Sequence, residues 1–449
     1  MPPIPTLSTR RILHTWWPLA ASWLLMGAEM PFLTAVMARL GNPEINLAAY
    51  GGVVFPLSMI IEAPIIMLLA ASTALCKDQA SYQLVRRFML IAGACLTGLH
   101  ILVAFTPLYY VVVEGILGVP QVIVEPARIG LMIMTPWTGS IAYRRFNQGV
   151  LIRFGRSQTV GWGTLIRLSA DAAVLLVGYL IGDIPGIVVA TSAVAAGVIC
   201  EAVYSGIVVR PVVQGPLRQA NPVVPALTWK AFYAFYIPLA LTSLLTLLAN
   251  PIISAALSRM PQALASLAVW PVVSGLIFMF RSLGVAYNEV VVALLDEPRS
   301  SGSLRRFAWL LTGGSTLGLL LIVATPLASL YFQFFSALPA HLLVLATTAI
   351  WLALPLPALS VFQSWFQGAI LHGRRTRGIT EAVGIYLLTS TITLWAGVAW
   401  GQTTGLYVGL ASLVISMVAQ TAWLWLRSRP VVETLRQRDA RPHTPASAI

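Results

Sequence analysis

Residues 264–295 read LASLAVWPVVSGLIFMFRSLGVAYNEVVVALL. The stretch exceeds the about 20 apolar residues that a helix needs to cross a bilayer. One cation, Arg281, lies near its middle, between Phe280 and Ser282. A guanidinium at that depth costs at least ~2.5–3.5 kcal/mol on insertion scales, so we expect it to face protein, water or a ligand. A structural ion pair between helices and a contact to substrate would both meet this requirement.

The composition predicts an all-α, polytopic membrane protein. Of 449 residues, 58% are hydrophobic and only 10% are charged, which excludes an ordinary soluble fold. Twelve apolar segments predict twelve transmembrane helices. They cover residues 12–39, 49–76, 88–110, 123–149, 158–182, 185–209, 231–258, 262–295, 307–330, 340–371, 378–399 and 404–427.

Basic residues orient these helices. With the N-terminus in the cytoplasm, 23 of the 28 lysines and arginines fall on the cytoplasmic side, Arg144 and Arg145 among them. Arg39, Arg128 and Arg259 then lie near the outer face. The positive-inside rule therefore predicts two cytoplasmic termini in a plasma membrane, or an inner membrane if the protein is bacterial. It also explains the net charge of +13 without a nucleic-acid partner.

An internal repeat divides the chain. At an offset of 219 residues, RPVV at 210–213 recurs at 429–432, and Thr-Pro-Leu at 106–108 recurs at 325–327. At an offset of 220, Pro-Leu-Ala at 18–20 recurs at 238–240. Six helices per half predict two parallel, pseudo-symmetric bundles around a central cleft. We expect a first lobe at 1–209, a cytoplasmic linker at 210–229, a second lobe at 230–428 and a disordered cytoplasmic tail at 429–449.

The repeat places Glu62 and Arg281 at equivalent positions of helices 2 and 8. If both face the cleft, the pseudo-two-fold axis sets the two opposite charges on facing walls. One interpretation is a structural ion pair across the cleft. The other is a pair that opens when substrate or a proton enters, and the sequence does not separate the two. In the second case Arg281 attracts an anionic group and Glu62 is the partner that the substrate displaces.

Further polar residues are candidates for the same cavity. Arg167 and Asp171 are spaced i, i+4 on helix 5 and can pair on one helix face, which a purely structural role would also explain. Asn288 follows Arg281 by seven residues and can share its face. Asn250 precedes a proline in helix 7, and Glu29 is an acid in helix 1.

Several kinds of chemistry have no support in the sequence. Neither lysine belongs to a GxxxxGK[ST] phosphate loop, so no nucleotide-hydrolysing domain is indicated. The five histidines and three cysteines form no metal-ligand or disulfide spacing. We therefore expect neither a metal nor a cofactor, and no enzymatic activity.

Short motifs carry a family resemblance. They are WWPLA at 16–20, GAE at 27–29, LAAYG at 47–51, FYIPLAL at 235–241, QGVLIRFGRSQT at 148–159 and QGAILHGRRTR at 367–377. With the six-plus-six repeat, the chain resembles the MATE-type branch of the multidrug/oligosaccharidyl-lipid/polysaccharide flippase superfamily. Within that branch it is similar to the progressive ankylosis protein group.

The resemblance implies two lobes that rock to expose a central cavity alternately. The progressive ankylosis group implies export of small anions such as pyrophosphate, citrate or nucleotides. MATE exporters imply efflux of cations or drugs driven by protons or sodium, often through an acid in helix 1, a position that Glu29 holds here. We expect a monomeric secondary transporter of small anions with Glu29 as its coupling acid. A multidrug exporter, a lipid-linked sugar flippase and a non-transporting membrane scaffold remain alternatives.

Overall fold

The protein is a bundle of long helices. The structure, a computed structural model, describes residues 7–297, 299–373 and 377–440. The first half contains α1 (Thr9–Met37), α2 (Pro43–Ala49), α3 (Phe55–Ile66), α4 (Leu68–Leu75), α5 (Gln79–Phe105), α6 (Leu108–Tyr110), α7 (Val124–Ile133), α8 (Thr135–Arg153), α9 (Gln158–Ile181), α10 (Gly186–Gln214) and α11 (Pro216–Gln219). The second contains α12 (Trp229–Ser258), α13 (Ala263–Leu294), α14 (Ser300–Ala324), α15 (Leu327–Leu330), α16 (Ala340–Ala349), α17 (Leu356–His372), α18 (Arg377–Trp400) and α19 (Gly405–Ala440). Short π-helical or 3-10 turns lie at Tyr50–Val54, Val111–Leu117, Gln121–Ile123, Tyr331–Phe335 and Ile350–Ala353.

The all-α, twelve-helix prediction is confirmed. Within the described ranges, eleven helical stretches are long and apolar enough to cross a membrane. The remaining predicted span, 123–149, consists of α7 and α8. Three arginines, at 128, 144 and 145, lower its hydropathy, so length and composition alone do not identify it as a span.

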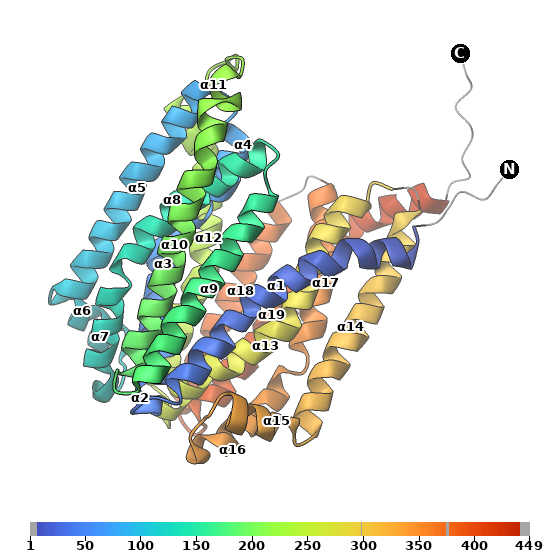
Figure 1. Cartoon of the computed structure of the whole chain (residues 1–449). Helices are drawn as coiled ribbons and strands as arrows, with labels where there is room; N and C mark the ends of the chain where they lie inside the picture. The colour runs from blue at the N-terminus through green and yellow to red at the C-terminus, as the bar shows by residue number, and fades with distance from the viewer. Residues whose placement is uncertain (1–6, 298, 374–376, 441–449) are drawn as a thin grey trace, which may run out of the picture.

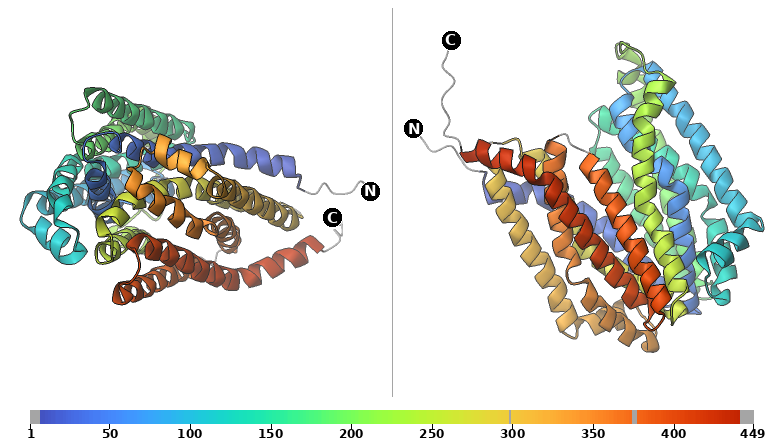
Figure 2. Two further views of the ribbon diagram at one scale, coloured as in Figure 1. Left: turned by 90° about the horizontal axis from the view of Figure 1, so that it is seen from below. Right: turned by 180° about the vertical axis from the view of Figure 1, so that it is seen from behind.

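The two halves lean apart at one end. α1 begins and α19 ends at that end, and from there the halves converge toward the opposite end, where α2 and α16 lie (Figure 1). Viewed from below, the N-terminal part of α1 extends across to the helices of the second half (Figure 2). Its buried residues Ile12, Trp16 and Ala20 join a cluster that otherwise belongs to the second half.

The same hydrogen bonds recur in both halves at the repeat offsets. Trp16 Nε1 donates to the Leu283 carbonyl at 3.0 Å, and Tyr236, its counterpart in α12, donates to the Pro64 carbonyl at 2.5 Å. Both bonds join one half to the other. α1 and α12 therefore each donate an equivalent hydrogen bond to the other half.

Two arginines close the converging end. Arg39, two residues beyond the end of α1, donates to the carbonyls of Phe334 and Phe335 in the second half. Its counterpart Arg259, the C-cap of α12, donates to the carbonyls of Ile116 and Leu117 in the first half, at 2.6 and 2.7 Å. We call these two sets of hydrogen bonds the arginine clasps.

The predicted linker is helical over its first half. α10 continues to Gln214 and so includes the first RPVV motif, and α11 follows after Gly215. The backbone N–H of Val223 donates to Asp78 Oδ2 at 2.8 Å, which ties the linker to the start of α5. Asp78 is also the N-cap of α5, where its carboxylate accepts from the Ser81 N–H at 2.9 Å.

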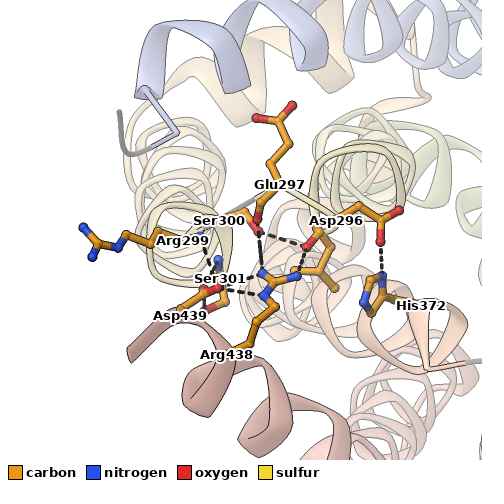
Figure 3. A network of polar contacts seen from close by, with 9 residues as sticks. Asp296, Glu297, Arg299, Ser300, Ser301, His372, Arg438 and Asp439 are labelled. Atoms are coloured by element: carbon orange, nitrogen blue, oxygen red, sulfur yellow. Dashed lines mark hydrogen bonds and ion pairs between the residues drawn. The ribbon is translucent and has the colours of Figure 1, made fainter. Parts of the chain in front are cut away.

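The prediction of a disordered tail from residue 429 is wrong as far as Ala440. α19 continues through the second RPVV motif, because Val431 and Leu435 are buried against the second half. Asp439 then accepts hydrogen bonds from the backbone N–H groups of Arg299 and Ser301, at 3.2 and 3.0 Å, and so caps α14 (Figure 3). Arg438 donates to the Leu295 carbonyl at 2.9 Å in the same network (Figure 3). Residues 441–449 of the predicted tail lie outside the described residues.

Candidate functional site

A cavity of about 220 Å³ lies beside Arg281. Helix α1 contributes one wall, α13 the second and α17 the third. The lining residues are Trp23, Arg281, Val285, Asn288, Glu289, Ser360, Gln363, Ser364 and Gln367. Amide, hydroxyl and charged groups thus meet in a part of the bundle that is otherwise apolar, as ligand pockets require.

Arg281 has no acidic partner among the described residues. Its Nε donates to Ser360 Oγ at 3.1 Å, and its side chain takes part in no ion pair there. Its two terminal nitrogens do not belong to the fully buried polar atoms that lack a hydrogen-bond partner. Because the cavity is lined by this residue, the guanidinium can offer a ligand two N–H groups and a full positive charge.

Two of the predicted site residues meet at this cavity. Arg281 and Asn288 both line it, and Asn288 Nδ2 donates to the Ser364 carbonyl at 3.2 Å. Asn250 of α12 is not among its lining residues. The other predicted residues, Glu29, Glu62, Arg167 and Asp171, belong to the first half.

The first half contains a buried charge network. Arg144 and Glu201 form an ion pair, and Gln148 Nε2 donates to the same carboxylate at 2.8 Å. Arg167 Nη2 lies 2.8 Å from Glu29 Oε2, and its Nε lies 3.7 Å from Glu201 Oε2. The network links α1, α8, α9 and α10. Arg144 and Arg145, which we expected on the cytoplasmic side, lie within α8; Arg144 is buried, and acids within the bundle compensate their charge.

The expected pairing of Arg167 with Asp171 is also wrong. Arg167 forms an ion pair with Glu29. Both carboxylate oxygens of Asp171 are fully buried and have no hydrogen-bond partner among the described residues. Asp171 is 4% exposed. A Cβ at Gly197 would lie 1.8 Å from Asp171 Oδ1, so α10 can pass this carboxyl group only with glycine at that position. An i, i+4 spacing permits a pair, but the neighbouring helix supplied a better-placed acid.

Glu62 and Arg281 do not face each other across a cleft in this conformation. Glu62 is buried in α3. The cations that act on it are Arg145 and Arg144 of the first half, whereas Arg281 contacts Ser360 of the second. The pseudo-two-fold axis relates the two positions. Glu62, however, lies near α8 of the first half, and Arg281 contacts α17 of the second.

A hydrogen bond between two glutamines beside the cavity is the neutral counterpart of the Arg144–Glu201 ion pair. At the repeat offset Gln363 corresponds to Arg144 and Gln420 to Glu201, and Gln363 Nε2 donates to Gln420 Oε1 at 3.1 Å. The second half thus repeats the contact of the first with amides in place of charges. Trp23, Ser360, Gln363 and Ser364 were not among the residues predicted from the sequence, although Gln-Gly at 148–149 recurs at 367–368 in the same region.

Among the described residues, no group of three or more histidine, cysteine, aspartate or glutamate side chains is placed to hold a metal ion. The carboxylates of Glu29 and Glu201 instead face guanidinium groups.

The fold is that of the MATE transporters. No protein-family model and no curated protein matches the sequence. The chain is similar to the inward-facing conformation of a multidrug resistance MATE family transporter of the MOP superfamily, at a TM-score of 0.68 and 15% identity over 94% of this chain and 99% of that one. An outward-facing conformation of such a transporter gives a TM-score of 0.60 at 14% identity over 96% of this chain and all of the other. A MOP superfamily transporter from Pyrococcus furiosus, described as having a binding pocket of reverse polarity, gives a TM-score of 0.63 at 15% identity over 96% of this chain and all of the other.

Proposed function

We propose that the protein is a secondary transporter that exports small organic or phosphate-type anions by alternating access. One observation carries the proposal: Arg281 lines a cavity inside the bundle and forms no ion pair with an acid of the described residues. An uncompensated guanidinium at this depth is unfavourable, so binding of an anion there is favoured. Asn288 and Gln367 add neutral hydrogen-bonding groups to the same walls.

The charge network of the first half is proposed to couple transport to a proton or sodium gradient. Glu29 holds Arg167 at 2.8 Å, while Asp171 lies one helical turn away on α9 without a partner among the described residues. Protonation of Glu29 removes its attraction for Arg167. The guanidinium can then turn to Asp171, and this exchange of partners changes the contact between α1 and α9.

The arginine clasps fit one state of an alternating-access cycle. They join the halves at the end opposite the termini, where the halves converge (Figure 1). With both termini in the cytoplasm of a plasma or bacterial inner membrane, this is an inward-facing state. Its higher TM-score with the inward-facing neighbour agrees with that assignment. We propose that a monomer suffices for the cycle.

A cation or drug exporter is the second candidate. In and around the charge network of the first half lie four acids, at 29, 62, 171 and 201, and three arginines, at 144, 145 and 167. A cationic substrate or ion could therefore bind there, as the names of the multidrug neighbours would suggest. A lipid-linked sugar flippase and a non-transporting scaffold lack a comparable observation in their favour, and so does an enzyme.

Counterflow into proteoliposomes tests the proposal. Vesicles loaded with pyrophosphate, citrate, a nucleotide, a monocarboxylate or a cationic dye would be compared, with and without a pH gradient. We expect exchange of an anion, and at least a tenfold loss in Arg281→Gln. Arg306→Gln removes an equal charge from an exposed position at the start of α14 and serves as the matched control. Exchange of cationic dyes alone, or anion exchange unchanged in Arg281→Gln, would refute the anion site.

A further inference from the structure

We infer that the Arg281 cavity selects ligands with a single negative charge: small organic monoanions with hydroxyl or amide groups. We also infer that Glu289 enforces this selection. The inference rests on the proposed function and narrows its substrate class. It disfavours pyrophosphate, citrate and nucleotide di- and triphosphates, which carry several negative charges near neutral pH.

Two charged residues of opposite sign line the cavity. Among the described residues that line it, Arg281 is the one cation and Glu289 the one anion. Both belong to α13 and lie eight residues apart, or about 12 Å along the helix at ~1.5 Å per residue. One negative group of a ligand can be neutralised at Arg281. A second negative group would find no cation, and toward Glu289 it would meet a like charge.

The repeat shows that further cations could have been accommodated here. Arg144 and Arg145 of α8 correspond to Gln363 and Ser364 of α17, and both of these line the cavity. The backbone therefore tolerates two guanidinium groups at these positions when acids accompany them. In the second half both are neutral, so the cavity lacks the additional positive charge that a polyanion needs.

The neutral residues fit a polar body rather than an apolar one. Asn288 uses its amide N–H₂ for the Ser364 carbonyl, which leaves its Oδ1 as an acceptor. Gln363 is engaged with Gln420, while no hydrogen bond ties Gln367 to another described residue. Hydroxyl and amide groups of a ligand can therefore pair with Asn288 and Gln367. The volume of about 220 Å³ is below the ~300–1,000 Å³ typical of pockets for drug-sized molecules.

Glu289 is placed to act on a ligand. Its Oε1 accepts from Trp23 Nε1 at 3.4 Å, which joins α1 to α13 at the wall of the cavity. Glu289 is itself exposed, so its carboxylate needs no cation for its stability. Along α13, Glu289 lies between Arg281 and the end of the bundle where α1 begins. It is a specificity-determining residue in this account, since it penalises a second negative group without binding the first.

A charge series in proteoliposomes tests the inference. Counterflow of labelled N-acetylglycine, a monoanion with an amide, would be competed with unlabelled N-acetylglycine, malonate, citrate and pyrophosphate at pH 7.4. In wild type we expect the monoanion to compete at least tenfold better than malonate, a difference of about 1.4 kcal/mol. In Glu289→Gln we expect this ratio to fall several-fold. Glu433→Gln removes an exposed acid of α19 away from the cavity, and it should keep the wild-type ratio.

The outcomes separate the inference from the proposed function. Equal or better competition by malonate or citrate in wild type would overturn the inference and leave anion transport standing. A ratio in Glu289→Gln that equals that of Glu433→Gln would remove Glu289 from selection. Absence of exchange for every anion, with exchange of a cationic dye, would overturn the proposed function itself.

Discussion

The two halves of the molecule have the same scaffold and different chemistry. Close helix contacts are repeated: a Cβ at Gly178 would lie 2.3 Å from Val189 Cγ1, and one at Gly397 would lie 2.3 Å from its counterpart, Val408 Cγ1. The ionisable groups of the charge network are not repeated. The first half buries arginines and acids in one network, whereas the second has amides in their place and the guanidinium of Arg281 at a cavity.

The comparison shows that helix packing is the same in both halves, whereas the buried charges differ. Helix packing depends on the shape of a residue, so glycines and branched side chains recur at the repeat offset. Both members of the buried pair differ between the halves. The second half has Gln363 and Gln420 at the positions of Arg144 and Glu201, so neither half buries one member of the charged pair without the other. The halves could thus divide coupling and substrate binding between them.

The largest effect is expected from breaking the pair in the charged half. Glu201→Gln leaves Arg144 buried without a carboxylate and removes the second acid near Arg167. We expect a loss of about 3–5 kcal/mol, as for other buried ion pairs that lose one partner. Thermal unfolding in detergent, followed by tryptophan fluorescence, would measure it.

The neutral half provides the control for this variant. Gln420→Met changes the equivalent position, where the hydrogen bond from Gln363 is between neutral groups. We expect a loss of about 1 kcal/mol or less. Equal destabilisation by Glu201→Gln and Gln420→Met would contradict the assignment of the charged network to one half.

An intermediate effect is expected from the arginine clasps, where the halves should behave alike. Arg39→Gln and Arg259→Gln each remove two charged hydrogen bonds between the halves. Both arginines are exposed, so each should contribute at most about 1.5 kcal/mol to the closure of the converging end. Spin labels on α2 and α16 would report the distance between the halves. We expect both variants to shift the population toward a wider separation at this end, and the double variant to shift it further; no shift in either would argue against the clasps.

The smallest effect concerns the cap of α5. Burial raises the pKa of Asp78, but hydrogen bonds from Ser81 and Val223 outweigh it and hold the pKa below its usual value. Since the folded-state pKa is the lower one, this stabilisation is complete above the pKa of the unfolded state. It is lost as the pH falls through the folded-state value.

Asp78→Asn should therefore cost about 0.5–1 kcal/mol near neutral pH. The difference from wild type should shrink in acid below about pH 4, near the reference pKa of aspartate. Melting temperatures of the two proteins between pH 3 and 7 would test this. A difference that grows on acidification would show that the carboxylate is not what holds the linker to α5.

Helical periodicity was enough to predict the architecture and part of the cavity. Apolar lengths and the repeat gave twelve helices in two halves, and a spacing of seven residues put Asn288 on the face of Arg281. Trp23 and Ser360 were not predictable, because they come from helices whose rotation about their own axes is set by packing. Arg167 could not be assigned to Glu29 for the same reason: a local acid at i+4 was visible in the sequence, and a distant one was not.

Direct binding most sharply tests the division of labour between the halves. Labelled N-acetylglycine would be titrated onto purified wild type, Glu29→Gln and Arg281→Gln by scintillation proximity in detergent. We predict saturable binding to wild type and to Glu29→Gln, and at least a tenfold weaker affinity in Arg281→Gln. Binding that survives in Arg281→Gln and is lost in Glu29→Gln would place the anion site in the first half and contradict the account.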